Sequence, residues 1–225
     1  MKNSLALLII LLFVISGYSQ DKNIEAINFE KQILKSAHRV GDPAVATASI
    51  YRIIALEGKN STYKDSLAYI YFAARQYAPC FMMATEVLER DPNHQNMLEI
   101  KGVSLESLGA YTKASETYEQ LFAKSKNNYH GYTLAKLKYT LKKYDEALKV
   151  ISAAEKLNDT GKYKITFAIN QTHEQEVLLI AAISYLKGII EVELKKPELA
   201  KVSLNKALTV QPDFVLAKEK LESLN

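Results

Sequence analysis

Four histidines and one cysteine are the residues best able to bind a metal or act as nucleophiles. The histidines, His38, His94, His130 and His173, are far apart in the sequence. His173 has a second ligand-type residue at helical spacing, Glu176, but a metal site needs three or four converging ligands. We therefore interpret this pair as solvated surface and predict no metal site.

The chain carries no recognisable set of catalytic residues. It lacks a glycine-rich phosphate loop, a nucleophile elbow and a zinc-protease motif. Its 29 basic and 25 acidic residues give a net charge of +4, which is too balanced for a nucleic-acid binder. We predict a protein that is not an enzyme, needs no cofactor and binds no nucleic acid. A deep pocket with a third ligand beside His173 and Glu176 would favour an enzyme instead.

Small residues recur at regular intervals and indicate internal repeats. One column steps by 34, 34, 33 and 53 residues, and its members are Ala46, Cys80, Ala114, Ala147 and Ala200. Two further columns keep the same steps. They are the residues Pro43, Tyr77, Tyr111, Tyr144 and Pro197, and the residues Leu34, Ala68, Gly102, Ala135 and Gly188. Cys80 stands in a close-packing column, which predicts a buried, inert thiol.

Within each unit the apolar residues have helical spacing and are interrupted by a turn. The first helix of one unit carries Leu98, Gly102 and Leu105, and the second carries Ala114 and Tyr118. Small residues in both helices allow the two backbones to approach closely. Each unit is therefore expected to be a pair of packed helices.

A period near 34 with these columns resembles the tetratricopeptide repeat (TPR). The resemblance implies an all-α fold class, a TPR helical-hairpin solenoid that forms a right-handed superhelix. We expect about five repeats and a C-terminal capping helix. The spans are 27–60, 61–94, 95–127, 128–160 and 181–214 for the repeats, 161–180 for an insertion and 213–225 for the cap, all within a solenoid of 27–225 that follows a linker at 20–26.

The insertion explains the one long step between repeats. Tyr163, Ile165, Phe167 and Ile169 alternate with smaller or more polar residues, as in a short strand or an apolar loop folded onto the solenoid. The run from His173 to Glu176 is interpreted as an early start of the next helix. A packed connector and a functional element both fit this segment.

The resemblance also implies where a partner binds, because first helices of such repeats line the concave face of the superhelix. The residues expected there are Tyr69, Phe72, Glu99, Glu106, Tyr132, Lys136, Tyr139 and Tyr185. Their aromatic members would form a groove for an extended or helical peptide, flanked by Lys136. The alternative is that several of these rings pack between neighbouring units.

A clamp for C-terminal carboxylates, known in the family, is not reproduced. Lys31 matches its first lysine, but Lys35 and Ser66 stand where asparagines are required. We therefore do not predict capture of a carboxylate tail.

The N-terminal residues have the chemistry of an export signal. Lys2 precedes an apolar core of 11 residues, Leu5 to Ile15, followed by Ser16-Gly17-Tyr18-Ser19-Gln20. This core is short of the ~20 residues that span a bilayer. We predict a signal peptide at 1–19, resembling those of exported Bacteroidota proteins, and a periplasmic or cell-surface location. The alternative is an uncleaved inner-membrane anchor at residues 5–18.

Together these features predict a non-catalytic scaffold, exported to the periplasm or cell surface, that holds a protein or peptide in its concave groove. The alternative is a structural subunit of an envelope assembly. Such a subunit would dock by its convex face or by the insertion at 161–180.

Overall fold

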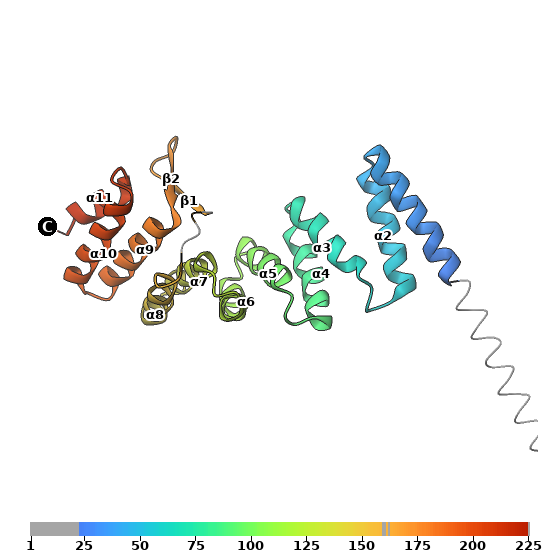
Figure 1. Ribbon diagram of the computed structural model, residues 1–225, viewed down its shortest axis with the longest axis horizontal. Coiled ribbons are helices and arrows are strands. Elements are labelled where there is room, and N and C mark those ends of the chain that lie inside the picture. Colours follow the sequence, from blue (N-terminus) through green and yellow to red (C-terminus); the bar gives the residue numbers. More distant parts are fainter. Residues whose placement is uncertain (1–22, 159–160, 162, 225) are drawn as a thin grey trace, which may run out of the picture. The chain divides into compact units, whose positions relative to one another are not determined.

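The computed structural model describes residues 23–158, 161 and 163–224, which form two compact units divided between Pro92 and Asn93. Each unit consists of helical hairpins (Figure 1). The predicted signal peptide at 1–19 and the alternative anchor at 5–18 lie outside the described residues. Residues 23–26, predicted to be linker, are helical.

The first unit contains two helical hairpins. Residues 23–40 are helical and pair with α2 (Pro43–Glu57), and α3 (Tyr63–Ala73) pairs with α4 (Tyr77–Arg90). Asp42 caps α2 by accepting hydrogen bonds from the backbone nitrogens of Ala44 and Val45, at 3.1 and 3.0 Å. The core of this unit is apolar and includes Leu34, Ala46, Ile50, Ile53 and Leu67.

The second unit contains three helical hairpins, a β-hairpin and a final helix. The helical pairs are α5 (Gln95–Ser107) with α6 (Tyr111–Ser125), α7 (Asn128–Thr140) with α8 (Tyr144–Ala154), and α9 (Leu179–Glu193) with α10 (Pro197–Val210). Strands β1 (Lys164–Ala168) and β2 (Glu174–Leu178) precede α9, and α11 (Val215–Glu222) follows α10. The predicted fold class of stacked TPR-type hairpins is confirmed, with a small β-hairpin added to it.

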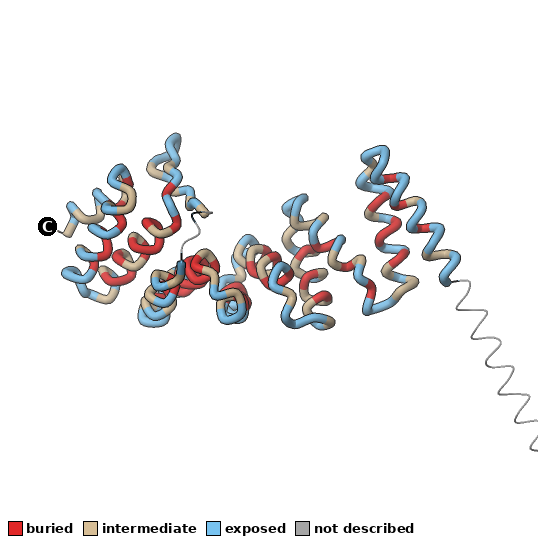
Figure 2. The backbone as a smooth tube through the Cα atoms, viewed as in Figure 1, coloured by how far each residue is buried: buried red, intermediate tan, exposed pale blue. Residues whose placement is uncertain are grey.

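The small-residue columns pack the paired helices together. All five members of the column that begins at Ala46 and of the column that begins at Leu34 are buried, and buried residues run between the paired helices in both units (Figure 2). A Cβ atom on Gly102 would lie 2.6 Å from the Tyr118 ring, and one on Gly188 would lie 2.9 Å from Leu204. The two helices of these hairpins therefore touch at positions where a larger side chain does not fit.

A left-handed residue ends the first helix of every hairpin. Its positive φ lies between 55° and 74°, and the residues are Gly41, Arg75, Gly109, Lys142 and Lys195. In each case the next residue donates its backbone N–H to the carbonyl five positions earlier, as Ala110 does to Leu105 at 2.8 Å. This is the Schellman motif, which satisfies the last carbonyls of a helix and turns the chain.

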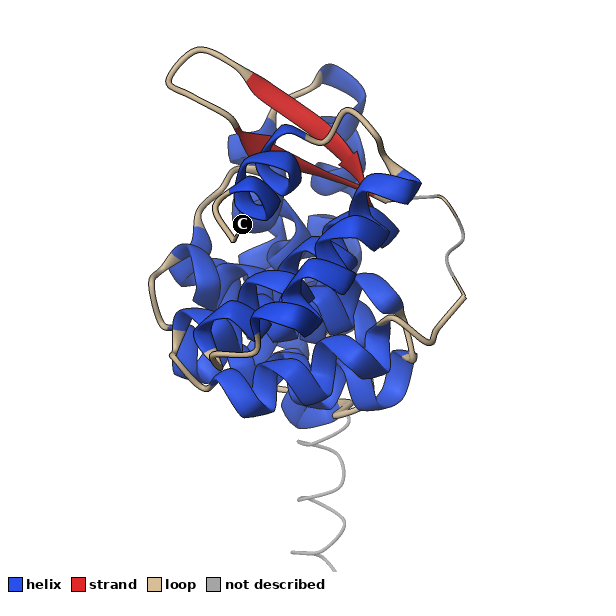
Figure 3. Cartoon of the chain, turned by 90° about the vertical axis from the view of Figure 1, so that its left-hand side faces the viewer, coloured by secondary structure: helices blue, strands red, loops and turns tan. Residues whose placement is uncertain are grey.

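The insertion forms a two-stranded antiparallel sheet that packs on the helices of its own unit (Figures 1 and 3). Ile165 pairs with Val177, and Phe167 pairs with Gln175. Val177 is buried, and Tyr163, Ile165 and Phe167 pack against the core of the unit. The alternating apolar residues are thus the inner face of a strand, which was one of the two predicted forms.

Two glutamines fasten β2 to the turn before α11. Gln175 donates to the Asp213 carbonyl at 2.8 Å and accepts from the Val215 backbone nitrogen at 3.1 Å. Gln211 donates to the Glu176 carbonyl at 3.1 Å and accepts from the Leu178 backbone nitrogen at 3.0 Å. Each side-chain amide donates one hydrogen bond and accepts another, and together they join the β-hairpin to the last helix.

The predicted helix start at His173 is wrong. Residues Glu174–Leu178 form β2, and α9 begins at Leu179. Polar residues before an apolar run are typical of a helix N-terminus, but here the hydrogen bonds to Gln211 and the pairing with β1 favour the strand.

Exchanging the left-handed turn residues tests their role. Lys142→Gly should stabilise the chain by about 1 kcal/mol and Gly109→Lys should destabilise it by about the same amount, because only glycine adopts this conformation without strain. Urea unfolding followed by circular dichroism measures both changes.

Lys149→Gly, within α8, is the matched control and should destabilise by about 1 kcal/mol. If Lys142→Gly destabilised the chain as much as the control, the strain at this turn would be disproved.

Candidate functional site

A pocket of about 430 Å³ opens among α5, α6 and α7 of the second unit. Its lining combines charged, hydroxyl and aromatic side chains with one aliphatic residue. The lining residues are Val103, Glu106, Ser107, Tyr111, Tyr118, Tyr129, Thr133 and Lys136. Pockets of this size with a few convergent polar groups are typical binding sites.

Two predicted site residues form an ion pair in this pocket. Lys136 Nζ of α7 lies 2.7 Å from Glu106 Oε1 of α5, with the side chains 45% and 27% exposed. Each stands on the first helix of its hairpin, so adjacent hairpins are linked at this point. Because both groups are partly exposed, the pair contributes little to stability and is open to a ligand.

A second carboxylate, Glu99, lies about two helical turns before Glu106 on α5. Its Oε1 atom is 3.7 Å from Nε2 of the buried His130, whose Nδ1 is 2.8 Å from the Ser125 hydroxyl. The Glu99 side chain is 41% exposed. A carboxylate thus faces solvent beside the pocket.

Two of the pocket tyrosines, Tyr118 and Tyr129, are held in their neutral form. Burial, followed by the negative charges of Glu99 and Glu106, raises the pKa of Tyr129. Burial, Tyr129 and the same two carboxylates also raise the pKa of Tyr118. Tyr129 stacks on Tyr163 at 4.6 Å between ring centroids, which joins the pocket wall to the residue before β1.

Three other predicted site residues of this unit pack within the protein. Tyr132 is only 6% exposed and belongs to the core, so its ring is not accessible to a partner. Tyr185 is half-buried, with Phe167 and Phe214 at 5.6 and 4.9 Å between ring centroids. Tyr139 is half-buried and 5.6 Å from the Tyr144 ring.

The β-hairpin accounts for much of this burial. Its residues Ile165, Phe167 and Val177 pack in the core that contains Tyr132 and Tyr185. The alternative interpretation, that some of the predicted rings pack between elements, therefore holds for these two tyrosines. Among the charged predicted residues of this unit, the side chains of Glu99, Glu106 and Lys136 are 41%, 27% and 45% exposed.

The remaining two predicted residues, Tyr69 and Phe72, lie on α3 of the first unit. Tyr69 is 42% exposed and Phe72 is half-buried. Phe72 stands three residues before the left-handed Arg75, as Glu106 stands three before Gly109.

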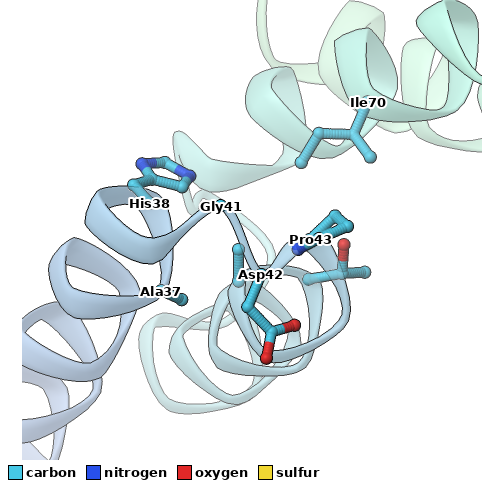
Figure 4. A pocket seen from close by; sticks show the side chains of 8 residues that line it. Ala37, His38, Gly41, Asp42, Pro43 and Ile70 are labelled. Atoms are coloured by element: carbon cyan, nitrogen blue, oxygen red, sulfur yellow. The ribbon is translucent and has the colours of Figure 1, made fainter.

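A corresponding pocket of about 370 Å³ lies in the first unit. Figure 4 shows Ile70 of α3 approaching the turn that holds His38 and Pro43. His38 and Pro43 have the same spacing from Gly41 as Glu106 and Tyr111 have from Gly109. The lining here is largely apolar, and its one carboxylate, Asp42, caps α2.

Sequence reasoning did not identify the tyrosines of the second-unit pocket as site residues. Tyr111 was already in a repeat column, because it begins the second helix, and this position also places it beside the turn that borders the pocket. Tyr129 gave no such signal, since its role depends on the stacking of Tyr163 from the insertion.

The residues first considered for metal or nucleophilic chemistry are engaged in structure. His173 lies at the start of β2, 2.8 Å from the Thr172 hydroxyl, and Glu176 pairs with Lys164 at 3.0 Å. In a strand, residues three apart point to opposite faces, so the expected helical pairing does not form. In the described ranges no three His, Cys, Asp or Glu residues come together as a metal site. Cys80 is buried, with its Sγ 3.5 Å from the Ala68 carbonyl.

Comparison with known families gives one match, a tetratricopeptide repeat model that covers residues 181–214. Helices α9 and α10, which lie in the matched segment, have the same left-handed turn and buried small-residue columns as the other hairpins. No curated protein matches the sequence.

Solved structures share the fold at low sequence identity. YrrB, described as a TPR protein with an unusual peptide-binding site, has a TM-score of 0.66 and 18% identity, over 92% of this chain and 96% of YrrB. A TPR protein from Parabacteroides merdae gives 0.62 and 15%, over 89% of this chain and 72% of that one. MamA from Desulfovibrio magneticus gives 0.60 and 15%, over 84% and 97%.

Neutralising Glu99 tests the electrostatics of the pocket. Glu99→Gln should lower the pKa of Tyr129 toward the ordinary value of 10.0, while burial keeps it above that value. A pH titration followed by NMR of tyrosines labelled with ¹³C measures the change. Glu116→Gln, on the exposed side of α6, is the matched control and should leave the pKa of Tyr129 unchanged.

The raised pKa values of these tyrosines also make the stability of the fold depend on pH. Because the folded state raises the pKa of Tyr118 and Tyr129, their neutral phenols stabilise it fully below pH 10 and this stability is lost as the pH rises above that value. If the pKa of Tyr129 were unchanged in Glu99→Gln, the charge of Glu99 would not be one of the causes that raise it.

Proposed function

We propose that this TPR scaffold binds a protein or peptide segment, without a chemical step, at the pocket formed by α5, α6 and α7. The observation that carries the proposal is the partly exposed Glu106–Lys136 pair set among tyrosines at the junction of two first helices. Peptide binding is also consistent with the fold shared with YrrB, although likeness at 18% identity carries no residue roles.

The pocket is suited to a side chain presented by an extended segment. Val103 and Thr133 offer aliphatic contacts, Tyr111 is 41% exposed, and the charged pair supplies both a donor and an acceptor. A few fixed polar groups beside aromatic surface give orientation and specificity to a bound peptide.

The alternative, an envelope subunit that docks through residues 161–180, has less support. The apolar residues of the hairpin pack on its own unit, and β1 presents Lys164, Thr166 and Ala168 to solvent. The packed connector therefore describes this segment better than a docking element does.

We also propose export to the periplasm or cell surface, on the strength of the apolar segment at residues 5–15. In the described part of the chain, no helix has the length and apolar character needed to cross a membrane. Mass spectrometry of the envelope fraction of cells that express the chain should find a mature N-terminus at Gln20. Recovery of an intact residue 5–18 segment in the inner membrane would favour the anchor instead.

Filling the pocket tests the proposed binding site. A peptide selected from a random library for binding to the full-length chain should lose about tenfold or more in affinity for Val103→Trp, because the indole fills the pocket without changing its charge. Isothermal titration calorimetry measures the affinity, and circular dichroism verifies folding.

Val202→Trp, at a position of α10 that is 67% exposed, is the matched control and should bind as the unaltered chain does. Equal loss in both variants, or no loss in either, would overturn the assignment of binding to this pocket.

A further inference from the structure

We propose that the pocket among α5, α6 and α7 receives a cationic side chain, lysine or arginine, from the bound segment. This inference rests on the proposed peptide binding and adds the chemistry of the residue that is recognised.

The charges around the pocket favour a cation. Glu99 and Glu106 contribute two negative charges on one face of α5, and Lys136 contributes one positive charge. His130 is buried against Ser125 and adjoins Glu99. The charges of Glu99, Glu106 and Lys136 sum to one negative charge, which a lysine or arginine from a partner would neutralise.

The two carboxylates act on the same part of the pocket. Both raise the pKa of Tyr129 and of Tyr118, so their fields overlap at these rings. A cation placed between α5 and α7 would lie in that field and would meet carboxylate oxygens that are partly exposed. Charge-assisted hydrogen bonds of this kind are stronger than those between neutral groups.

The aromatic lining supplies a second attraction. Tyr111 and Tyr129 present phenol rings to the pocket, and aromatic rings attract cations at their faces. The first unit contains an intramolecular example, since Lys31 Nζ lies 5.6 Å from the centre of the Tyr63 ring. The methylene stem of the ligand side chain would pack along Val103 and Thr133.

The experiment begins with decapeptides selected from a random library on the full-length chain. We expect the selected peptides to share a lysine or arginine. Replacing that residue by norleucine or citrulline, which keep the shape and remove the charge, should weaken binding about tenfold.

Variants of the pocket give effects of opposite sign. Glu106→Gln should weaken the selected peptide about tenfold, whereas Lys136→Met should strengthen it, because this change removes the competing cation. Glu116→Gln and Lys149→Met alter charge equally at exposed positions of α6 and α8 and should leave the affinity within about twofold.

The outcomes separate this inference from the proposed function. Peptides that bind, lose affinity for Val103→Trp and show no dependence on a basic residue would overturn the cationic ligand and leave peptide binding at the pocket intact. Stronger binding to Glu106→Gln would also overturn it, by indicating an anionic ligand. A library that yields no binding peptide would contradict both proposals.

Discussion

The close approach of the two helices in each hairpin is the constraint on which the rest of the structure depends. Gly102 and Gly188 stand where even a Cβ atom would overlap the opposite helix. The columns that begin at Ala46 and at Leu34 are buried throughout. A Schellman turn with a left-handed residue reverses the chain at the same place in every helical hairpin. These features fix which side chains of a first helix point toward the next hairpin, and so they place Glu106 opposite Lys136.

The β-hairpin determines how much of the first-helix surface stays accessible in the second unit. It packs on α7 and α9 through Tyr163 and Phe167 and is fastened to the turn before α11 by Gln175 and Gln211. As a result, Tyr132 is buried and Tyr185 is half-buried on the surface expected to bind a partner. The open pocket lies one step earlier, among α5, α6 and α7, where Tyr163 before the β-hairpin stacks on Tyr129.

Much of the fold could be predicted from the sequence, because a helix contact that recurs in every repeat requires small residues at recurring positions. The columns through Gly102 and Ala114 predicted paired helices, and the alternation from Tyr163 to Ile169 allowed a strand. The second strand was missed because His173 to Glu176 reads as a polar helix start, and its true partners are Gln211 and β1, which only the folded chain brings near. The left-handed conformation of Lys142 was not predicted, because lysine is not a typical residue for that conformation.

The candidate site was predictable in part. Glu106 and Lys136 have the right spacing to face each other from adjacent first helices, whereas the burial of Tyr132 depends on an insertion that folds back onto its own unit. The tyrosines of the pocket come from two helices, α6 and α7, and became a set only once these were packed together.

Peptide binding at the pocket among α5, α6 and α7 can be tested by NMR of ¹³C-labelled tyrosines in the full-length chain, with and without a selected peptide. The resonances of Tyr111 and Tyr129 should shift on binding, while those of Tyr185, covered by the hairpin, should not. Shifts confined to Tyr185 and Tyr163, with Tyr111 unchanged, would place binding at the β-hairpin and contradict binding at this pocket.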